Sequence, residues 1–281
     1  RKKKFGLLAP FVVLDRPATA RGGPLEFERE DHERRIEFGG RFRRFYPAGG
    51  FAASGTVLHH AHLTLHTVAH LALCVKGLTM GLSGRRGKLA MHQCYHPHFD
   101  DHLCAGCDLC IDSCPEQALQ AAQEGPPSVS ADACIGCAEC MAVCPEGAIR
   151  MQGEEVSDWG RGEQSLPFRM VDYLLGLMDG RWEDVIHIAH MYDITRLCDC
   201  VDESQEPICG HLGFLVGRNP LAVDLAARRL LEEELGATTG GRGIRSYHPQ
   251  DAGCAMFDYA RTTYGVLTEP ELLTHNVEVT R

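Results

Sequence analysis

The hydrophobic pattern of the C-terminal half alternates between the periods of strands and helices. Short apolar runs bounded by turn residues indicate strands, and apolar residues three or four positions apart indicate helices. Strands are predicted over Val185–Ile188 and Leu212–Val216, and helices over Met170–Met178, Leu221–Leu235 and Asp251–Tyr264. The second helix follows Asn219-Pro220, which is typical of a helix start. Strands that alternate with helices predict an α/β core.

The N-terminal part carries two further patterns. Phe11–Leu14 is a short apolar run with β-branched residues, which predicts a buried strand. Val57–Leu73 is apolar but contains five histidines. Among these, His62, His66 and His70 recur every four residues, so a helix here would place them on one side.

Residues 94–153 differ in composition from the rest of the chain. They are rich in Cys, Ala, Gly and Pro and poor in large aliphatic residues. We interpret them as a small inserted domain within a core domain made of residues 1–93 and 154–281. The length of 281 residues has room for about two domains of ordinary size.

Charge and hydropathy exclude two classes of protein. The chain has 28 Lys and Arg against 38 Asp and Glu, a net charge of −10 that argues against nucleic-acid binding. No apolar run approaches the length of about 18 residues that a transmembrane helix needs. The basic Arg1–Lys4 followed by the apolar Phe5–Leu14 has the order of a secretory leader. Pro10 and Asp15 favour instead a basic turn before a buried strand.

Eight of the fourteen cysteines fall in two matching runs, thirty residues apart. Each run reads Cys-x2-Cys-x2-Cys-x3-Cys-Pro, beginning at Cys104 and at Cys134, as in bacterial ferredoxins that bind [4Fe–4S] clusters. Three thiolates must converge on three corners of a cube, and two-residue spacers bring each sulfur to the same side. Gly106 and Gly136 allow the bend that this requires. The clustering predicts metal binding in a reducing compartment rather than disulfides, so we expect a cytoplasmic protein.

The fourth cysteine of each run is expected to bind the other cluster, which crosses the two ligand sets. One predicted set is Cys104, Cys107, Cys110 and Cys144. The other predicted set is Cys134, Cys137, Cys140 and Cys114. Two zinc ions are the alternative, but zinc ribbons use pairs of cysteines and need no third cysteine at this spacing. The predicted fold is therefore an α/β core with an inserted α+β ferredoxin-like 2[4Fe–4S] domain.

Several segments outside the cysteine runs carry a resemblance to a known family. They are Leu71–Gly81, Arg86–His92, Cys198-Asp199-Cys200 and Leu212–Asp224. Together with the runs they resemble iron–sulfur proteins called domain of unknown function family 362, in the version with an inserted two-cluster ferredoxin. The resemblance covers roughly residues 8–265 and implies a fold and cofactors rather than a reaction. Family members usually carry a further N-terminal region, so part of the sheet is expected to be absent here or supplied by a partner.

Histidines and the remaining cysteines suggest a third metal site as a further hypothesis. Cys198 and Cys200 are expected to lie in a turn if they share one ion. The alternative is that the histidines fill core and loop positions. Cys74, Cys94, Cys209 and Cys254 are interpreted as small hydrophobic residues. The candidate ligands of the third site are His62, His66, His70, His92, Cys198 and Cys200.

Three functions remain open at this point. The first is an electron-transfer protein that serves a redox protein partner or a larger oxidoreductase complex, with no transmembrane segment. The second is a reductase, fed by the clusters, whose own substrate or metal site in the α/β cleft is lined by His66, His70, Lys76, Cys198 and Cys200. The third is a scaffold that carries or inserts clusters. A homo-oligomer is compatible with each.

Overall fold

The chain divides into two compact units in a computed structural model. The first unit comprises Arg1–Ala53 and Leu82–Arg169, and the second comprises Ser54–Gly81 and Met170–Arg281. The structure describes residues 34–35, 42, 44–92, 95–114, 116–123, 125–130, 133–134, 136, 139–153, 165–201, 204–249 and 251–273. The strand predicted over Phe11–Leu14 lies outside these residues, as do Cys94 and Cys137. The predicted domain boundaries at 94 and 153 stay a prediction.

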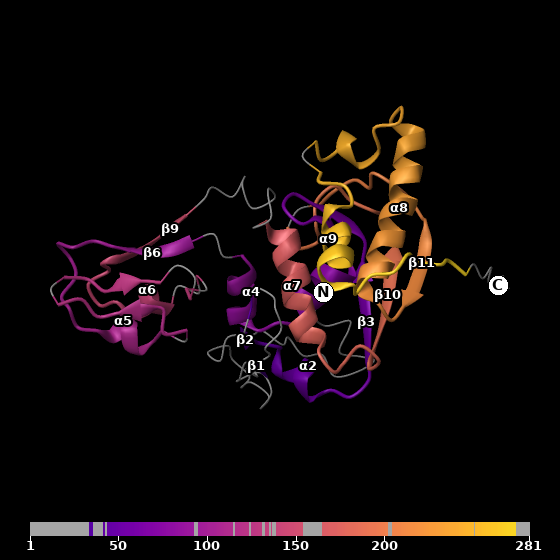
Figure 1. Cartoon of the computed structure of the whole chain (residues 1–281). Coiled ribbons are helices and arrows are strands. Elements are labelled where there is room, and N and C mark those ends of the chain that lie inside the picture. The colour runs from indigo at the N-terminus through magenta and orange to yellow at the C-terminus, as the bar shows by residue number, and fades with distance from the viewer. Residues whose placement is uncertain are drawn as a thin grey trace. The chain divides into compact units, whose positions relative to one another are not determined.

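The first unit is built from short strands and helices (Figure 1). Its strands are β1 (Arg34–Arg35), β2 (Arg44–Phe45), β6 (Tyr95–Phe99), β7 (Leu119–Gln120), β8 (Ser128–Val129) and β9 (Ile149–Gly153). Its helices are α2 (Gly49–Ala53), α4 (Arg85–Met91), α5 (Leu109–Asp112) and α6 (Glu139–Val143). The strands form three antiparallel pairs, β1–β2, β6–β9 and β7–β8. Helix α7 (Leu166–Met178) begins in this unit and continues into the second.

The thirty-residue repeat of the cysteine runs is also a repeat of structure. Phe99 on β6 pairs with Ile149 on β9, and Val129 on β8 pairs with Leu119 on β7. Phe99 and Val129 are thirty residues apart, and so are Leu119 and Ile149. The two strand pairs are therefore related by an approximate twofold symmetry. These four side chains pack together with Cys110, Cys114, Cys140 and Cys144 in one small core. These cysteines are therefore part of the hydrophobic core of this region.

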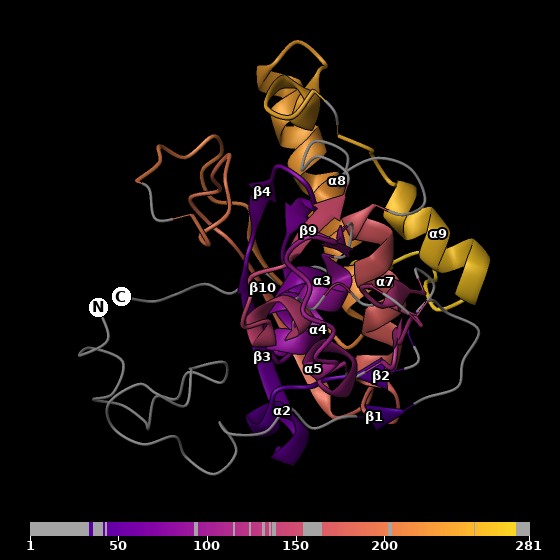
Figure 2. The same cartoon turned by 90° about the vertical axis from the view of Figure 1, so that its left-hand side faces the viewer.

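A three-stranded sheet organises the second unit. Its strand order is β11 (Gly213–Gly217), β10 (Val185–Met191), β3 (Val57–His62). Strand β10 runs parallel to β3, beside which it lies in Figure 2, and antiparallel to β11. Alternate residues of β10 are buried, from Val185 to Met191. One face of the sheet is thus packed in the core, as a period of two requires.

Helices cover the buried side of this sheet. Helix α8 (Pro220–Thr238) contacts β10 and β11, and α9 (Ala255–Tyr264) follows a short 3₁₀ turn over Gly243–Ser246. The side chain of Asn219 accepts hydrogen bonds from the N–H groups of Leu221 and Ala222, which satisfies the first turn of α8. The helices and strands predicted for this part of the chain are confirmed, with ends shifted by a few residues.

The histidine-rich segment forms strands, so its histidines are not stacked along one side of a helix. After β3, a hairpin of β4 (Thr64–His66) and β5 (His70–Ala72) pairs His66 with His70. Helix α3 (Cys74–Lys76) then continues into a π-helical turn over Gly77–Gly81. Turns of this type are often found at functional sites.

The described residues have mixed α and β content with small sheets. The parallel pairing of β3 and β10 agrees with an α/β arrangement, while the ferredoxin-like nature of the insert stays a prediction. No helix among the described residues combines the length and hydropathy needed to cross a lipid bilayer.

Candidate functional sites

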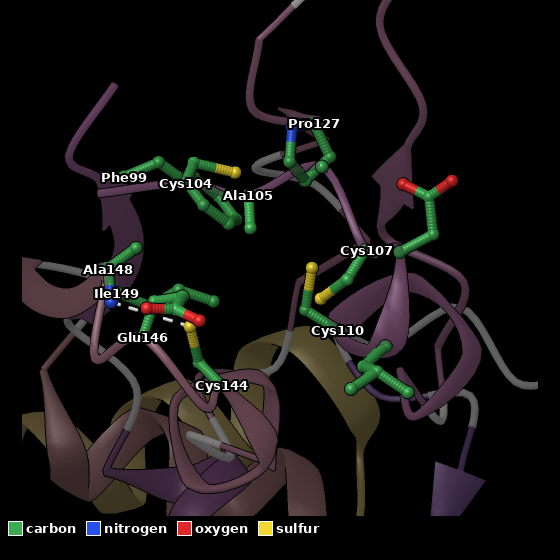
Figure 3. Close-up of a pocket in the computed structure, with 13 residues that line it drawn as sticks. Phe99, Cys104, Ala105, Cys107, Cys110, Pro127, Cys144, Glu146, Ala148 and Ile149 are labelled. Atoms are coloured by element: carbon green, nitrogen blue, oxygen red, sulfur yellow. Dashed lines mark hydrogen bonds between the residues drawn. The ribbon is translucent and has the colours of Figure 1, made fainter. Parts of the chain in front are cut away.

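Four cysteines from both runs line one pocket of the first unit. Cys104, Cys107, Cys110 and Cys144 surround it, together with Phe99, Pro127, Ala148 and Ile149. Figure 3 shows their sulfur atoms directed towards the space between them. The first three come from one loop and the fourth from the other run, which is the arrangement expected for a crossed ligand set.

Backbone geometry bends the two loops in the same way. Gly106 and Gly136 have φ angles of 64° and 61°, a left-handed conformation that glycine adopts without steric cost. The N–H of Ala118 donates to Cys114 Sγ at 3.3 Å, and the N–H of Ala148 donates to Cys144 Sγ at 3.4 Å. These hydrogen bonds are also thirty residues apart, so each fourth cysteine meets the same surroundings.

The second predicted set is described in part. Cys114, Cys134 and Cys140 are among the described residues, whereas Cys137 is not. The thiol of Cys134 lies close enough to Cys114 for their charges to interact, and this pairing also crosses the runs. Burial raises the pKa of the Cys134 thiol and of the Cys110 thiol. Because thiolates are the metal-binding form, a bound cation would be needed to keep these sulfurs ionised.

A second group of polar residues lies in the other unit. Cys198 begins a tight turn in which its carbonyl accepts a hydrogen bond from the N–H of Val201 at 2.9 Å. The turn brings both Cys198 and Cys200 to Lys76 on α3. Lys76 Nζ lies 3.1 Å from Cys198 Sγ and 3.7 Å from Cys200 Sγ. The turn expected for these two cysteines is therefore present.

This environment gives the two thiols different acidities. Burial alone would raise the pKa of Cys198, but hydrogen bonds from Cys200 and the positive charge of Lys76 outweigh it, so its pKa lies below the ordinary value. One of these bonds runs from the N–H of Cys200 to Cys198 Sγ at 3.3 Å. Burial and the proximity of Cys198 raise the pKa of Cys200. Cys198 is buried and Cys200 is exposed, so the pair combines a more acidic inner thiol with a less acidic outer thiol.

Only some of the predicted histidines adjoin this group. His62 contacts Asp199, between the two cysteines, with 2.7 Å between His62 Nδ1 and Asp199 Oδ2. His66 instead accepts hydrogen bonds from the N–H groups of Val68 and Ala69 within the β4–β5 hairpin. His70 is buried on the same hairpin, and His92 belongs to the first unit.

A further group, His59, Cys74 and His187, was not predicted from the sequence. All three side chains are buried, and their potential ligand atoms lie within 4.8 Å of one another. Burial lowers the pKa of His59 to about 4 and that of His187 to about 3, so both imidazoles are neutral near pH 7. The available signal was His187 within the strand predicted over Val185–Ile188, whereas no strand was predicted around His59. The contact itself depends on the pairing of the strands that carry the two histidines.

Comparison with known proteins supports part of the resemblance. A family model described as Domain of unknown function (DUF362) matches residues 15–229. No match is found among curated proteins or among solved structures. The family match includes Lys76, Cys198 and Cys200 as well as both cysteine runs, but it names no cofactor. Because the matched range is well over half of the chain, the chain belongs to the DUF362 family.

Proposed function

We propose that this protein is an iron–sulfur electron carrier that holds two [4Fe–4S] clusters and exchanges electrons with a redox partner. The observation that carries the proposal is the pocket lined by Cys104, Cys107, Cys110 and Cys144. Three thiols from a Cys-x2-Cys-x2-Cys loop meet a fourth from the other run, as two-cluster ferredoxins require. Zinc sites need four ligands as well, but they do not need two runs that exchange their fourth cysteine.

The donor set fits this kind of group. Soft thiolate ligands select iron–sulfur clusters, zinc and copper(I) over hard cations. The small core around β6–β9 and β7–β8 limits the access of water to the buried sides of the cysteines. When bound, [4Fe–4S] clusters accept and release single electrons, at potentials tuned by hydrogen bonds to sulfur and by exposure. The N–H groups of Ala118 and Ala148 supply such hydrogen bonds to Cys114 and Cys144.

The surface beside the pocket supports exchange with a protein partner. Leu103 and Leu109 flank the first loop and are 46% and 47% exposed. Asp101, Asp108 and Asp112 are also exposed around them. An apolar centre with an acidic rim suits a partner with a positively charged face. A short distance between a cluster and the redox centre of the partner, with weak binding of the partner, would then allow rapid exchange of electrons.

The proposal is tested by electron transfer from the reduced protein to a cytochrome under anaerobic conditions. Cys110→Ala is expected to abolish the reduction signal of one cluster and the transfer that depends on it. Cys254→Ala is the matched control, because Cys254 lies in the second unit and outside both runs. Unchanged transfer in Cys110→Ala, or equal loss in Cys254→Ala, would contradict the proposal.

A second candidate function is a reductase whose own site is the Lys76, Cys198 and Cys200 group. The distance of 3.1 Å between Lys76 Nζ and Cys198 Sγ favours it, because a neighbouring cation stabilises a thiolate. Oxidation of both thiols to a disulfide would supply two electrons and two protons to a substrate. The clusters would be the source of the electrons that restore the dithiol.

Replacement of one thiol separates the two candidates. Under the reductase proposal, Cys198→Ser leaves the iron content unchanged and stops substrate reduction, whereas Cys209→Ser leaves both the iron content and substrate reduction unchanged. Retained reduction in Cys198→Ser would exclude the reductase and leave the carrier. Loss of iron in that variant would show that Cys198 supports the clusters, and it would also count against a separate reductase site.

A further inference from the structure

Two inward-facing histidines meet at the centre of the sheet of the second unit. His59 on β3 and His187 on β10 are register partners, so their side chains leave the same face of the sheet next to each other. Their Nδ1 atoms lie 3.0 Å apart, and their rings are nearly perpendicular at 85°. The neighbouring inward positions hold Ala61 and Ala189, which are small and leave room beside the imidazoles.

A thiol completes the group from the opposite side of the core. Cys74 is the first residue of α3 and is fully buried. We propose that His59, Cys74 and His187 bind one Zn²⁺ ion that joins β3, β10 and α3. Their ligand atoms all lie within 4.8 Å of one another, a separation that an ion at bond lengths of about 2.0–2.3 Å can span. This site is separate from the pocket lined by the ferredoxin-type cysteines, which lies in the first unit.

Asp224 does not bind the ion itself but holds the ligand Cys74 in position through hydrogen bonds. Its carboxylate oxygens accept hydrogen bonds from the N–H groups of Cys74 and Val75, each at 2.9 Å. The Asp224 side chain is buried, and it also lies within hydrogen-bonding reach of the Cys74 thiol. These bonds fix the start of α3, and therefore the position of the Cys74 sulfur. Two histidines, one thiolate and one carboxylate would leave a bound Zn²⁺ and its surroundings electrically neutral, which favours burial.

The ring of His59 fits in its position because residue 77 is a glycine and has no side chain. A Cβ atom at Gly77 would lie only 2.5 Å from His59 Nε2. Any other residue at this position would push the imidazole away from its place beside His187. Gly77 thus allows α3 and its π-helical continuation to approach β3 closely enough for Cys74 to reach the histidines.

A hydrogen bond between the two imidazoles is the alternative arrangement. It would use one N–H and one lone pair, and the Cys74 thiol would have Asp224 as its polar contact. His187 Nε2 is buried and makes no hydrogen bond of good geometry among the described residues, although the Arg218 backbone lies close enough to oppose the fall in the pKa of the ring that burial causes. A purely hydrogen-bonded pair would therefore leave one buried ring nitrogen poorly satisfied, which is unfavourable.

Zinc K-edge X-ray absorption on the intact, anaerobically purified protein tests the proposal. The absorption edge is specific to the element, so iron in the other unit does not interfere. We expect about one zinc per chain, with one sulfur near 2.3 Å and nitrogen at about 2.0–2.1 Å. Absence of zinc from the wild-type protein after growth with zinc would overturn the proposal. Zinc surrounded by four sulfur atoms would place the ion at the ferredoxin-type cysteines and would overturn it as well.

Variants then identify the ligands. Cys74→Ala is expected to lower the zinc content about tenfold while the iron content stays unchanged. Cys209→Ala is the control, because Cys209 packs against the same core cluster as Cys74. A folded Cys74→Ala variant with full zinc would contradict the assignment. If that variant does not fold, the sulfur count at the zinc edge of the wild-type protein still decides, since the proposal requires a single sulfur.

Discussion

The two cysteine-containing regions of this protein are assembled in opposite ways. In the first unit, three of the four thiols that line the pocket come from one short loop, Cys104 to Cys110. In the second unit, Lys76 meets Cys198 across more than a hundred residues of sequence. A local site is encoded in its spacing, so the sequence reveals it directly. A site made by long-range contacts becomes visible only when the strands and helices are in place.

The largest effect is expected from variants that test whether the two ligand sets are crossed. Cys144→Ala should remove about four irons per chain, and so should Cys104→Ala, since both serve one cluster. The double variant Cys104→Ala/Cys144→Ala should lose no more iron than either single variant. Iron analysis and electron paramagnetic resonance of the reduced protein measure this.

The matched double variant is Cys134→Ala/Cys144→Ala, which takes one cysteine from each predicted set. It should lose both clusters. The reverse result, in which Cys104→Ala/Cys144→Ala loses both clusters and Cys134→Ala/Cys144→Ala loses only one, would mean that each run holds its own cluster.

The long-range site is tested by thiol reactivity. Lys76→Met removes the positive charge beside Cys198, so the pKa of Cys198 should rise towards its ordinary value. Alkylation near pH 7 should then slow by about tenfold for each unit of pKa, because less thiolate is present. The wild-type profile of rate against pH should be shifted to lower pH than that of an ordinary cysteine. Mass spectrometry of the labelled Cys198 peptide provides the rate.

Lys88→Met is the control for charge in general, because Lys88 lies in the first unit. Its alkylation profile should match that of the wild-type protein. A Cys198 rate that does not respond to Lys76→Met would show that the lysine does not stabilise the thiolate.

The local site predicts a smaller effect from backbone strain. At Gly106, φ is 64° and a Cβ would meet no atom within 4 Å, so alanine would be strained only by its backbone. Gly106→Ala should destabilise the loop by about 1–2 kcal/mol, measured by denaturant unfolding. Gly106→Asn should recover part of this loss, because asparagine tolerates the left-handed region. Gly55→Ala, where no positive φ is required, should have little effect.

The smallest effect concerns the acidic surface. Asp101→Asn and Asp112→Asn together should slow electron transfer to a cationic cytochrome by about two- to threefold at low salt. The difference should disappear at about 1 M salt, where charges are screened within a few ångströms. A difference that persists at high salt would point to a structural effect of the substitutions rather than to steering.

Sequence patterns predicted much of the fold because they report local structure. The Asn219 cap, the apolar spacing of α8 and the alternation of β10 each act within a few residues. The histidine segment was misleading because its four-residue spacing agrees with a helix, while β-branched and apolar neighbours favour strands. Strand pairing then placed His66 opposite His70 instead of along one side.

The sites likewise divide into those that local sequence patterns predicted and those that depend on long-range contacts. The lining of the first pocket by Cys104 and Cys144 agrees with the spacing rule, and the turn at Cys198 was expected. The group of His59, Cys74 and His187 was missed because Cys74 alone is indistinguishable from a small hydrophobic residue. Only the register of β3 with β10 brings the two histidines together.

The central claim is that the two runs hold two [4Fe–4S] clusters, and metal and sulfide analysis tests it most directly. The measurement is iron and acid-labile sulfide per chain in the anaerobically purified protein, with spectra before and after reduction. About eight irons and eight sulfides, with a signal that changes on reduction, is the result we predict. Zinc in place of iron at the eight cysteines, with no labile sulfide, would contradict it.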